Sequence, residues 1–300
     1  MKTIDYPWYR PPFPEYNAAQ SVAIPFIPQD MNLVISFATA AGKTVLAEGC
    51  FGYHLANQDQ CRVAYVCPFK SLASEKIKTW TADEQLNQYG LVLWSSDSDD
   101  DGRNTGGRII VSTLESFDIK TRTYGWLDWM KSLACVVVDE AHLIGDDSRG
   151  GAIEAALMRL SYINPSVRII LLSATMGNAV EIAKWVKTLN AKPTKCITSS
   201  WRPTKVEVEY HPIADYDEKV SKAIELADKA SLRKTLVFVH SKVTGASIVK
   251  RLRQRKVRAV FHNASLSAAK RRKIEEVFGD ANSGLNVLVS TSTLGAGVNL

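Results

Sequence analysis

The chain has 300 residues, of which 46% are hydrophobic and 23% charged, a composition typical of folded globular proteins. This length has room for two domains of ordinary size, and no apolar run approaches the roughly 20 residues needed to cross a bilayer. The composition thus argues against a disordered chain, a fibrous protein and a membrane-spanning protein.

The formal net charge of +6 is unevenly distributed. Residues 1–203 carry 20 Lys and Arg against 21 Asp and Glu, whereas residues 204–300 carry 17 against 10. An excess of cations in one part favours a polyanionic partner such as nucleic acid, although solvated helix faces produce the same pattern.

The N-terminal stretch "MKTIDYPWYRPPFPEY" has no apolar run of the signal-peptide type, so we expect an intracellular, soluble protein. This pattern does not distinguish the cytoplasm from the nucleus. The five cysteines fall in or beside apolar segments and form no CxxC pair. They therefore predict reduced, buried thiols rather than a disulfide framework or a zinc site.

Short apolar segments typical of strands buried on both faces recur along the chain. In the first part they are "NLVISF", "RVAYVC", "RIIVST", "ACVVVD" and "VRIILLS", and in the second "KTLVFVH", "VRAVFH" and "NVLVST". Segments of helical length, such as "KTVLAEGCFGYHLAN" and "SAAKRRKIEEVF", lie between many of them. Strands that alternate with helices predict α/β domains with parallel sheets.

A candidate linker spans residues 199–217, which contain two prolines and show no helical period. We predict an N-terminal segment at 1–17, a first domain at 18–203 and a second at 204–300. The polar, acidic stretch at 95–107 predicts a mobile surface loop.

The stretch "FATAAGKTVLAE" (37–48) joins a buried strand to a helix and ends its turn in Gly-Lys-Thr. Such a turn binds phosphate with its backbone N–H groups, although Phe37 occupies the position where the usual pattern has glycine. Lys43 would neutralise the β- and γ-phosphate oxygens, and the Thr44 hydroxyl would bind Mg²⁺. Small side chains that let the backbone curl around a phosphate precede them: Thr39, Ala40, Ala41 and Gly42. An ordinary capped helix is the alternative.

The stretch "CVVVDEAHLIG" places Asp139 and Glu140 at the carboxyl end of another buried strand, where parallel sheets bind their ligands. Asp139 would hold the Mg²⁺ shell, and Glu140 would orient the water that attacks the γ-phosphate. Acids at a helix N-terminus are the alternative, but they do not explain the apolar strand before them. The two motifs together predict an ATPase that uses ATP and Mg²⁺.

Joined to "LLSATMGN", the DEAH string resembles superfamily 2 helicases, a likeness that runs from about Gln20 to Leu300. "TAAGKT", "DEAHLIGDDSRGGAIE", "SATMGNAVEIAKW" and "WRP" are similar to the Ski-two-like branch, and within it to archaeal DNA-repair helicases. This resemblance implies two tandem RecA-like parallel-sheet domains of the P-loop NTPase class, the second apparently incomplete. It also implies that the branch tolerates Phe37 and Ala40.

The resemblance assigns further roles in the first domain. Gln20 matches the glutamine that reads the adenine edge, and His142 is the expected contact of the motif that couples phosphate state to domain closure. That coupling motif comprises Ser173, Ala174 and Thr175. Two turns, which otherwise are merely strand-to-helix turns, would hold the nucleic-acid backbone through Pro68, Lys70, Ser71, Ser112 and Thr113.

In the second domain, "VFVHSK", "FHNASL" and "VSTSTLGAGVNL" resemble the later motifs of the family. Asn263 and Ser265 depart from its usual histidine and glycine. Gly297 and Asn299 match positions that approach ATP. The residues implied to contact nucleic acid are His240, Ser241, His262, Asn263 and Thr291. The basic run at 250–258 indicates a solvated helix face.

The chain ends inside one of these motifs, before the arginines of the family that reach the γ-phosphate. We therefore expect a fragment of a longer protein, or a shortened relative that needs a partner chain, with slow hydrolysis on its own. The favoured function is an ATP-dependent helicase or translocase that moves 3′ to 5′ on single strands, DNA in preference to RNA. The alternatives are an RNA helicase of the same branch and an ATP-gated nucleic-acid clamp without unwinding.

Overall fold

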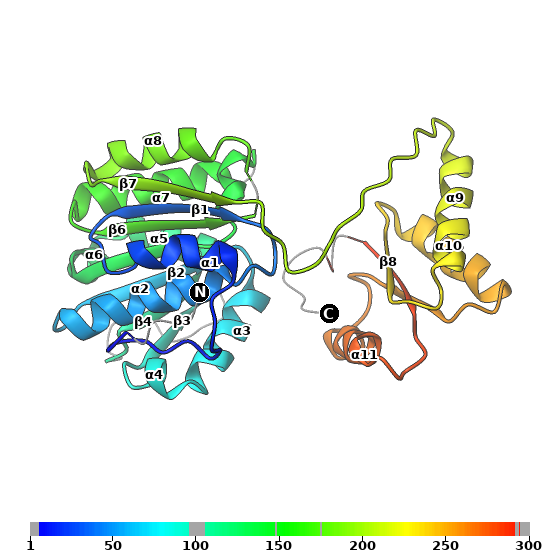
Figure 1. The fold of residues 1–300 in the computed structure, drawn as a ribbon, viewed down its shortest axis with the longest axis horizontal. Helices are drawn as coiled ribbons and strands as arrows, with labels where there is room; N and C mark the ends of the chain where they lie inside the picture. The colour runs from blue at the N-terminus through cyan, green and yellow to red at the C-terminus, as the bar shows by residue number, and fades with distance from the viewer. Residues whose placement is uncertain (1–5, 96–105, 148, 175, 292–293, 295–300) are drawn as a thin grey trace. The chain divides into compact units, whose positions relative to one another are not determined.

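Figure 1 shows the fold in a computed structural model, which describes residues 6–95, 106–147, 149–174, 176–291 and 294. The chain divides into two compact units, Met1–Val206 (unit 1) and Glu207–Leu300 (unit 2). Some predicted features lie outside the described residues: Thr175, Gly297, Asn299 and most of the stretch at 95–107.

Unit 1 is built on a parallel sheet of seven strands in the order β3-β4-β2-β5-β6-β1-β7. The strands are β1 (Asn32–Phe37), β2 (Arg62–Cys67), β3 (Leu91–Trp94), β4 (Ile109–Thr113), β5 (Leu133–Val138), β6 (Arg168–Ser173) and β7 (Thr194–Ser199). The five predicted strands are confirmed. The apolar-run criterion missed β3 and β7, because both lie at sheet edges and alternate between buried and more exposed residues.

Helices cover both faces of this sheet (Figure 1). The α-helices are α1 (Ala18–Ala23), α2 (Lys43–Asn57), α3 (Lys70–Thr81), α4 (Glu84–Asn87), α5 (Leu114–Arg122), α6 (Leu127–Ser132), α7 (Gly150–Ile163) and α8 (Ala179–Asn190). Short 3₁₀ helices are η1 (Ile24–Phe26), η2 (Tyr124–Trp126) and η3 (Ala141–Gly145). Leu33 and Ile35 belong to the core on one face and Val34 to the core on the other, as expected of a strand buried on both sides.

Unit 2 contains a parallel sheet of three strands in the order β8-β10-β9. Its elements are α9 (Tyr216–Lys229), β8 (Thr235–Phe238), α10 (Lys242–Gln254), β9 (Ala259–His262), α11 (Ala268–Gly279) and β10 (Val287–Ser290). Ile248, Leu252 and Val289 lie in its main core. All three predicted strands are present, so the α/β class with parallel sheets is confirmed in both units.

Three further observations concern the linker, the cysteines and possible membrane-spanning helices. Residues 200–215 contain no helix or strand, as expected of a linker. Four of the five cysteine thiols are buried, and Cys196 is half-buried. None of the helices in the described ranges combines the length and apolar character that a membrane span requires.

Candidate functional site

The turn between β1 and α2 has the backbone geometry of a phosphate-binding loop. Ala40 and Gly42 have φ angles of 61° and 77°, in the left-handed region that favours glycine. A Cβ on Gly42 would also lie 2.3 Å from Gln20 Nε2, so any larger residue would have to displace the Gln20 amide as well as adopt the left-handed backbone. The turn leads directly into the N-terminus of α2, where free N–H groups attract anions.

Lys43 curls back over this turn. Its Nζ donates to the carbonyl oxygens of Phe37 at 3.2 Å and Ala38 at 3.1 Å, which holds the ammonium at the mouth of the loop. Burial lowers the pKa of Lys43, and the negative charges of Glu140 and then Asp139 partly offset this effect. Residues from two distant strand ends therefore act on one another electrostatically.

Asp139 and Glu140 follow β5 at the same carboxyl edge of the sheet as the phosphate loop. Glu140 has a φ of 52°, and its backbone N donates to Asp139 Oδ1 at 2.9 Å. Burial raises the pKa of Glu140, and the neighbouring Asp139 raises it further, against His142 and Lys43. A carboxyl group tuned in this way suits a proton acceptor better than an ordinary surface glutamate does.

Tyr65, which the sequence analysis missed, links the two motifs. Its hydroxyl donates to Asp139 Oδ2 at 2.5 Å, and it lies near enough to the Thr44 side chain for that group to influence its pKa. Lys76 Nζ donates to Thr44 Oγ1 at 3.4 Å. A hydroxyl and a carboxylate gathered around one phenol are hard oxygen donors, which is the donor set that fits Mg²⁺.

The coupling motif contacts the DEAH segment through its serine. Ser173 Oγ lies 3.3 Å from His142 Nδ1, and that same nitrogen lies 3.4 Å from Glu140 Oε2. Ser36 at the end of β1 holds the motif from its other side, since its hydroxyl donates to the Ala174 carbonyl at 3.2 Å and accepts from the Met176 backbone N at 2.9 Å. No motif in the sequence singles out Ser36.

Gln20 lies beside the phosphate loop, but its amide is already engaged. Nε2 donates to the Gly42 carbonyl at 3.2 Å, and Oε1 accepts from the Asn17 backbone N at 3.1 Å. Asn17 Nδ2 donates to the Ala41 carbonyl at 3.1 Å. The pair forms a capping box on α1 that also supports the loop, so the N-x-x-Q spacing could have identified Asn17 from the sequence.

The turns predicted to hold nucleic acid in unit 1 follow β2 and β4. Lys70 and Ser71 are exposed at the start of α3, whereas Pro68 is buried. Ser112 and Thr113 are buried, and the Thr113 hydroxyl caps α5 by accepting from the Ser116 backbone N at 3.3 Å. The exposed pair is thus accessible to a strand, while the two buried hydroxyls stabilise the turn.

In unit 2 the predicted residues gather at the carboxyl ends of the three strands. His240 is exposed, and Ser241 caps α10 by accepting from Val243 N at 3.1 Å. His262 is only 1% exposed and its Nε2 lies 2.9 Å from Glu275 Oε1, so its ring is not available to a strand in this arrangement. The remaining two are Asn263, whose Oδ1 accepts from Ser265 N at 2.9 Å, and Thr291, which is half-buried.

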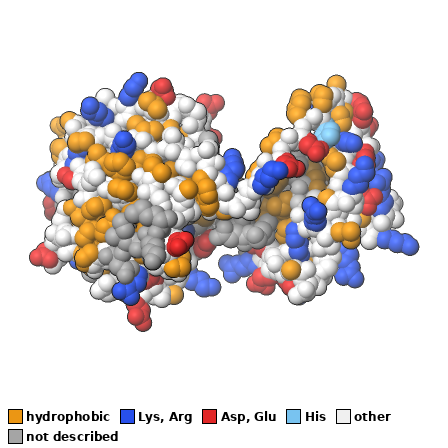
Figure 2. All heavy atoms as spheres, in the orientation of Figure 1, with side chains coloured by type: hydrophobic (Ala, Val, Ile, Leu, Met, Phe, Trp, Pro, Cys, Tyr) orange, Lys and Arg blue, Asp and Glu red, His pale blue; other side chains and the backbone are white. Residues whose placement is uncertain are grey.

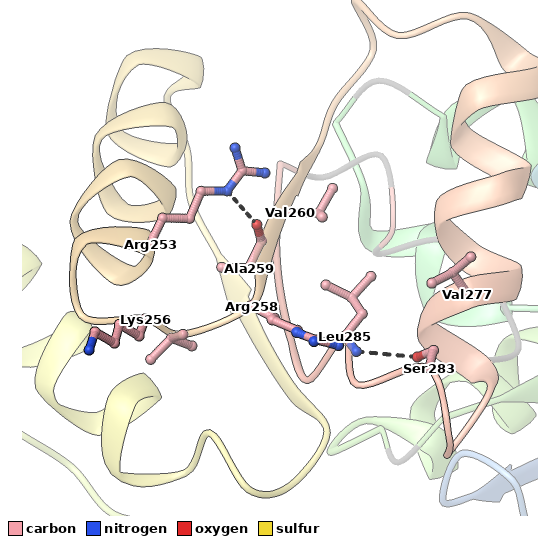
Figure 3. Close-up of a pocket in the computed structure, with 9 residues that line it drawn as sticks. Arg253, Lys256, Arg258, Ala259, Val260, Val277, Ser283 and Leu285 are labelled. Carbon is pink, nitrogen blue, oxygen red and sulfur yellow. Dashed lines mark hydrogen bonds between the residues drawn. The ribbon is translucent and has the colours of Figure 1, made fainter.

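The basic run at 250–258 lies at the opposite edge of this sheet. Its Lys and Arg side chains are exposed, as predicted for a solvated helix face, and Lys and Arg are spread over the face of unit 2 seen in Figure 2. Figure 3 shows a hollow of about 450 Å³ beside this run, where Arg253 Nε donates to the Ala259 carbonyl at 2.9 Å. The hollow is separate from the motif residues at the carboxyl ends of the strands.

Comparison with known proteins places this geometry in a family. Residues 17–182 match the DEAD/DEAH box helicase family, and residues 218–300 match the helicase conserved C-terminal domain. The chain belongs to the DEAD/DEAH box helicase family.

Curated relatives of this helicase chain include ATP-dependent DNA helicases of the Ski-two-like branch. The chain is 32% identical to Hel308 of Thermoplasma volcanium, over 94% of this chain and 45% of that protein. It is 29% identical to Hel308 of Methanococcus vannielii (90% and 42%) and 28% identical to MER3 of Saccharomyces cerevisiae (96% and 27%). The predicted resemblance to this branch is confirmed, and the chain spans less than half the length of these relatives.

Solved structures share the helicase fold. The DUF1998 helicase MrfA bound to DNA and AMPPNP superposes with a TM-score of 0.72 at 19% identity, over 94% of this chain and 42% of that one. Helicase Lhr of Mycobacterium smegmatis bound to ssDNA and AMP-PNP gives 0.65 at 22% identity, over 94% and 40%. The predicted pair of RecA-like domains is therefore confirmed.

Proposed function

We propose that this chain contains the ATP-driven motor of a DNA helicase, which moves 3′ to 5′ on single strands and separates duplex DNA. The observation that carries this proposal is the placement of Lys43, Asp139 and Glu140 at one edge of the seven-stranded sheet, near enough for the two acids to act on the pKa of Lys43. The names of the curated relatives support DNA as the nucleic acid. The domain limits 18–203 and 204–300 belong to the same proposal.

The residues of unit 1 divide the chemical work. The loop at 39–42 would bind phosphate through backbone N–H groups, and Lys43 would neutralise charge on the γ-phosphate. Thr44 and Asp139 would hold Mg²⁺, which supplies positive charge to the phosphate oxygens. Glu140 would accept the proton of the attacking water, a role that its raised pKa favours.

Contacts around His142 would report the state of this site. Its Nδ1 lies within hydrogen-bond reach of Ser173 and close to Glu140. A change at the γ-phosphate would therefore be transmitted through Glu140 and His142 to Ser173 of the coupling motif. Movement on a strand requires that each lobe hold the backbone differently before and after hydrolysis. Lys70 and Ser71 of unit 1 and His240 and Thr291 of unit 2 are our candidates for that hold.

The test is ATP hydrolysis by the full chain, with and without single-stranded DNA, under single-turnover conditions. We expect hydrolysis that depends on Mg²⁺, increases with the strand and is abolished in Lys43→Ala. Lys78→Ala, a lysine on the solvent side of α3, is the matched control. Strand binding that ATP controls without any hydrolysis would instead support the clamp.

Competition between the two nucleic acids decides the substrate. Single-stranded RNA of the same sequence should displace a labelled DNA strand poorly. Equal or better displacement by RNA would contradict the proposal of a DNA motor and favour an RNA helicase of the same branch.

A further inference from the structure

The 3₁₀ helix η3 follows the acid pair Asp139 and Glu140 directly, and α7 begins shortly after η3. The Gly150 backbone N donates to the Asp146 carbonyl at 2.8 Å, and a Cβ on Gly150 would lie 2.1 Å from the Ile144 carbonyl oxygen. Only glycine therefore allows α7 to begin so close to η3. Arg149, one residue earlier, is consequently held at a fixed position relative to Asp139 and Glu140.

The Arg149 side chain reaches both of the turns predicted to hold a nucleic-acid strand. Its Nη1 donates to the Pro68 carbonyl at 3.4 Å, and its guanidinium lies 5.1 Å from the centre of the Phe69 ring. Its Nε lies 3.8 Å from Glu115 Oε1, in the first turn of α5. One side chain thus joins the segment after the DEAH box to the ends of β2 and β4.

The ion pair between Arg149 and Glu115 adds little to the stability of the fold. The side chains of Arg149 and Glu115 are 36% and 56% exposed, and an ion pair at such exposure contributes roughly 0–1 kcal/mol. Because the three partners of Arg149 belong to two separate turns, these contacts instead fix the positions of the two turns relative to each other. A planar guanidinium can serve a carbonyl, a ring face and a carboxylate at once, whereas a lysine ammonium cannot.

We propose that Arg149 is a positioning residue that couples nucleotide binding at the acid pair to strand binding by the turns at Pro68–Lys70 and Thr113–Glu115. This inference rests on the proposed function. A shift of Asp139 and Glu140 on nucleotide binding moves η3, and the close contact at Gly150 carries that shift to Arg149. Arg149 then moves the two turns together, so the strand is held differently in the two nucleotide states.

The experiment measures the dissociation constant of the full chain for a fluorescent single-stranded oligothymidine, with and without a non-hydrolysable ATP analogue and Mg²⁺. Coupling between two sites typically changes affinity by about 5–150-fold. We expect an effect of this size in the wild type and less than about twofold in Arg149→Ala and Arg149→Lys. Strand affinity without nucleotide should stay within about twofold of the wild type.

Two further variants make the test specific. Arg122→Ala removes another arginine of the same region, whose partner is Asp118 on its own helix, and should leave coupling intact. The double variant Glu115→Arg with Arg149→Glu should couple better than either single variant, since it restores the pair with the charges exchanged. Failure of the double variant to do so would exclude the Glu115 contact from the proposal.

The outcomes separate the inference from the proposed function. Wild-type protein that binds neither nucleotide nor strand would refute the motor itself. Wild-type coupling that persists in folded Arg149→Ala and Arg149→Lys would overturn the role of Arg149 alone. Thermal melting checks folding, and Arg149→Lys, which keeps the charge, decides the matter if the alanine variant unfolds.

Discussion

Polar side chains lie at both the carboxyl and the amino ends of the strands in the seven-stranded sheet. The two groups differ in how fully the protein itself supplies their partners. At the carboxyl end, Ala40, Gly42 and Glu140 have left-handed backbones, and Lys43 and Glu140 have pKa values displaced by burial. Charged groups there lie close together without a complete set of partners of opposite charge. Such groups are ready to receive a charged ligand.

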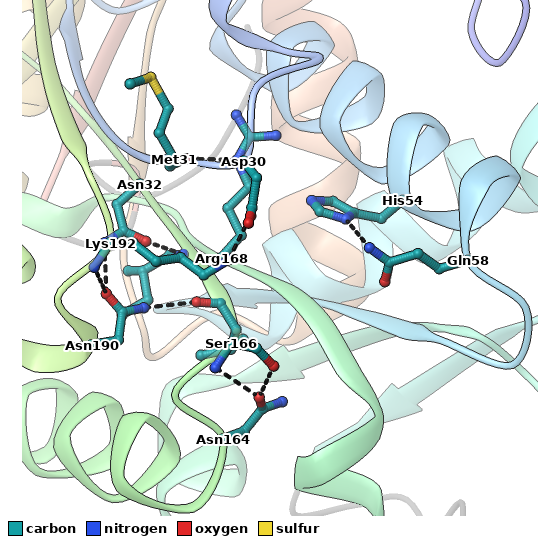
Figure 4. Close-up of polar contacts among 12 residues, drawn as sticks. Asp30, Met31, Asn32, His54, Gln58, Asn164, Ser166, Arg168, Asn190 and Lys192 are labelled. Atoms are coloured by element: carbon teal, nitrogen blue, oxygen red, sulfur yellow. Dashed lines mark hydrogen bonds and ion pairs between the residues drawn. The ribbon is translucent and has the colours of Figure 1, made fainter.

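At the amino end, the buried side chains of Arg168 and Asn164 are hydrogen-bonded within the protein (Figure 4), although the buried Nε2 of His54 has no hydrogen-bond partner among the described residues. The Arg168 guanidinium donates to the carbonyl oxygens of Phe26, Ile27 and Met31 at 2.7–2.8 Å. The amide of Asn164 donates to the carbonyl oxygens of Met130, Lys131 and Leu133 at 2.8–3.3 Å. These side chains fix the starts of strands and leave little capacity for a ligand.

Burial of a charged side chain does not by itself distinguish a structural role from a catalytic one. The hydrogen-bond partners of that side chain make the distinction. Arg168 is fully buried and structural because each of its three nitrogens donates to a backbone carbonyl, whereas Lys43 and Glu140 are partly buried and placed for chemistry. Substitutions at the carboxyl end should therefore change activity with little effect on stability. Substitutions at the amino end should do the reverse.

The largest effect is expected for Glu140→Gln. Removal of a positioned proton acceptor should lower the single-turnover rate of ATP hydrolysis by about 10²–10⁴-fold, while the urea midpoint stays near that of the wild type. Glu154→Gln, on α7, is the matched control and should hydrolyse ATP at the wild-type rate. A rate within about tenfold of the wild type would deny Glu140 this role.

Arg168→Ala should produce the opposite result. The fully buried guanidinium and its hydrogen bonds to three backbone carbonyl groups are lost, so we expect a loss of at least about 3 kcal/mol in the free energy of unfolding. Tryptophan fluorescence during urea unfolding reports on unit 1, because all seven tryptophans lie in it. Arg62→Ala removes one bond, to Ser132 Oγ, and should cost less than about 1 kcal/mol. Equal losses in the two variants would contradict the distinction.

The pH dependence of stability tests the role of His54 at the amino end of the sheet. Burial lowers its pKa from 6.5 to about 3, followed in size by the positive charge of Arg168, with Asp30 opposing and Lys192 assisting. Below pH 6.5, His54 therefore binds a proton in the unfolded state but not in the folded state. The free energy of unfolding consequently falls as the pH drops. Between pH 7 and pH 5 this loss is about 2 kcal/mol for one such histidine.

His54→Leu should remove that part of the pH dependence, as measured by urea unfolding at the two pH values. His211→Ala, an exposed histidine of unit 2, should leave it unchanged. A slope against pH identical in His54→Leu and the wild type would show that another group is responsible.

The smallest effect is expected for Glu48→Gln, on α2, the helix that follows the phosphate loop. Burial raises the pKa of Glu48, against hydrogen bonds from Tyr9 Oη at 2.6 Å and Trp80 Nε1 at 2.7 Å. Its carboxyl stabilises the fold at low pH, and this contribution is lost as the pH rises through the raised pKa. The melting temperature of the amide variant should rise relative to that of the wild type as the pH increases above the ordinary glutamate value of 4.5. Glu84→Gln, an exposed position, should show no such difference.

Much of unit 1 could be predicted because its signals are local. A strand buried on both faces is apolar on consecutive residues, and a phosphate loop consists of neighbours in the chain, so "NLVISF" and "TAAGKT" are informative by themselves. The same holds for the acid pair after β5 and for the family resemblance. The half-exposed edge strand β7 has no such pattern and was missed.

Tertiary structure alone decided which residues support these motifs. Tyr65 meets Asp139 across 74 positions and Arg149 meets Pro68 across 81, because parallel crossovers bring the carboxyl ends of separate strands to one edge. No spacing rule in the chain marks such pairs. Burial was equally unpredictable: Ser112 and His262 match strand-binding motifs, yet packing encloses their side chains. The Ser112 hydroxyl donates to the Thr113 carbonyl, and His262 pairs with Glu275.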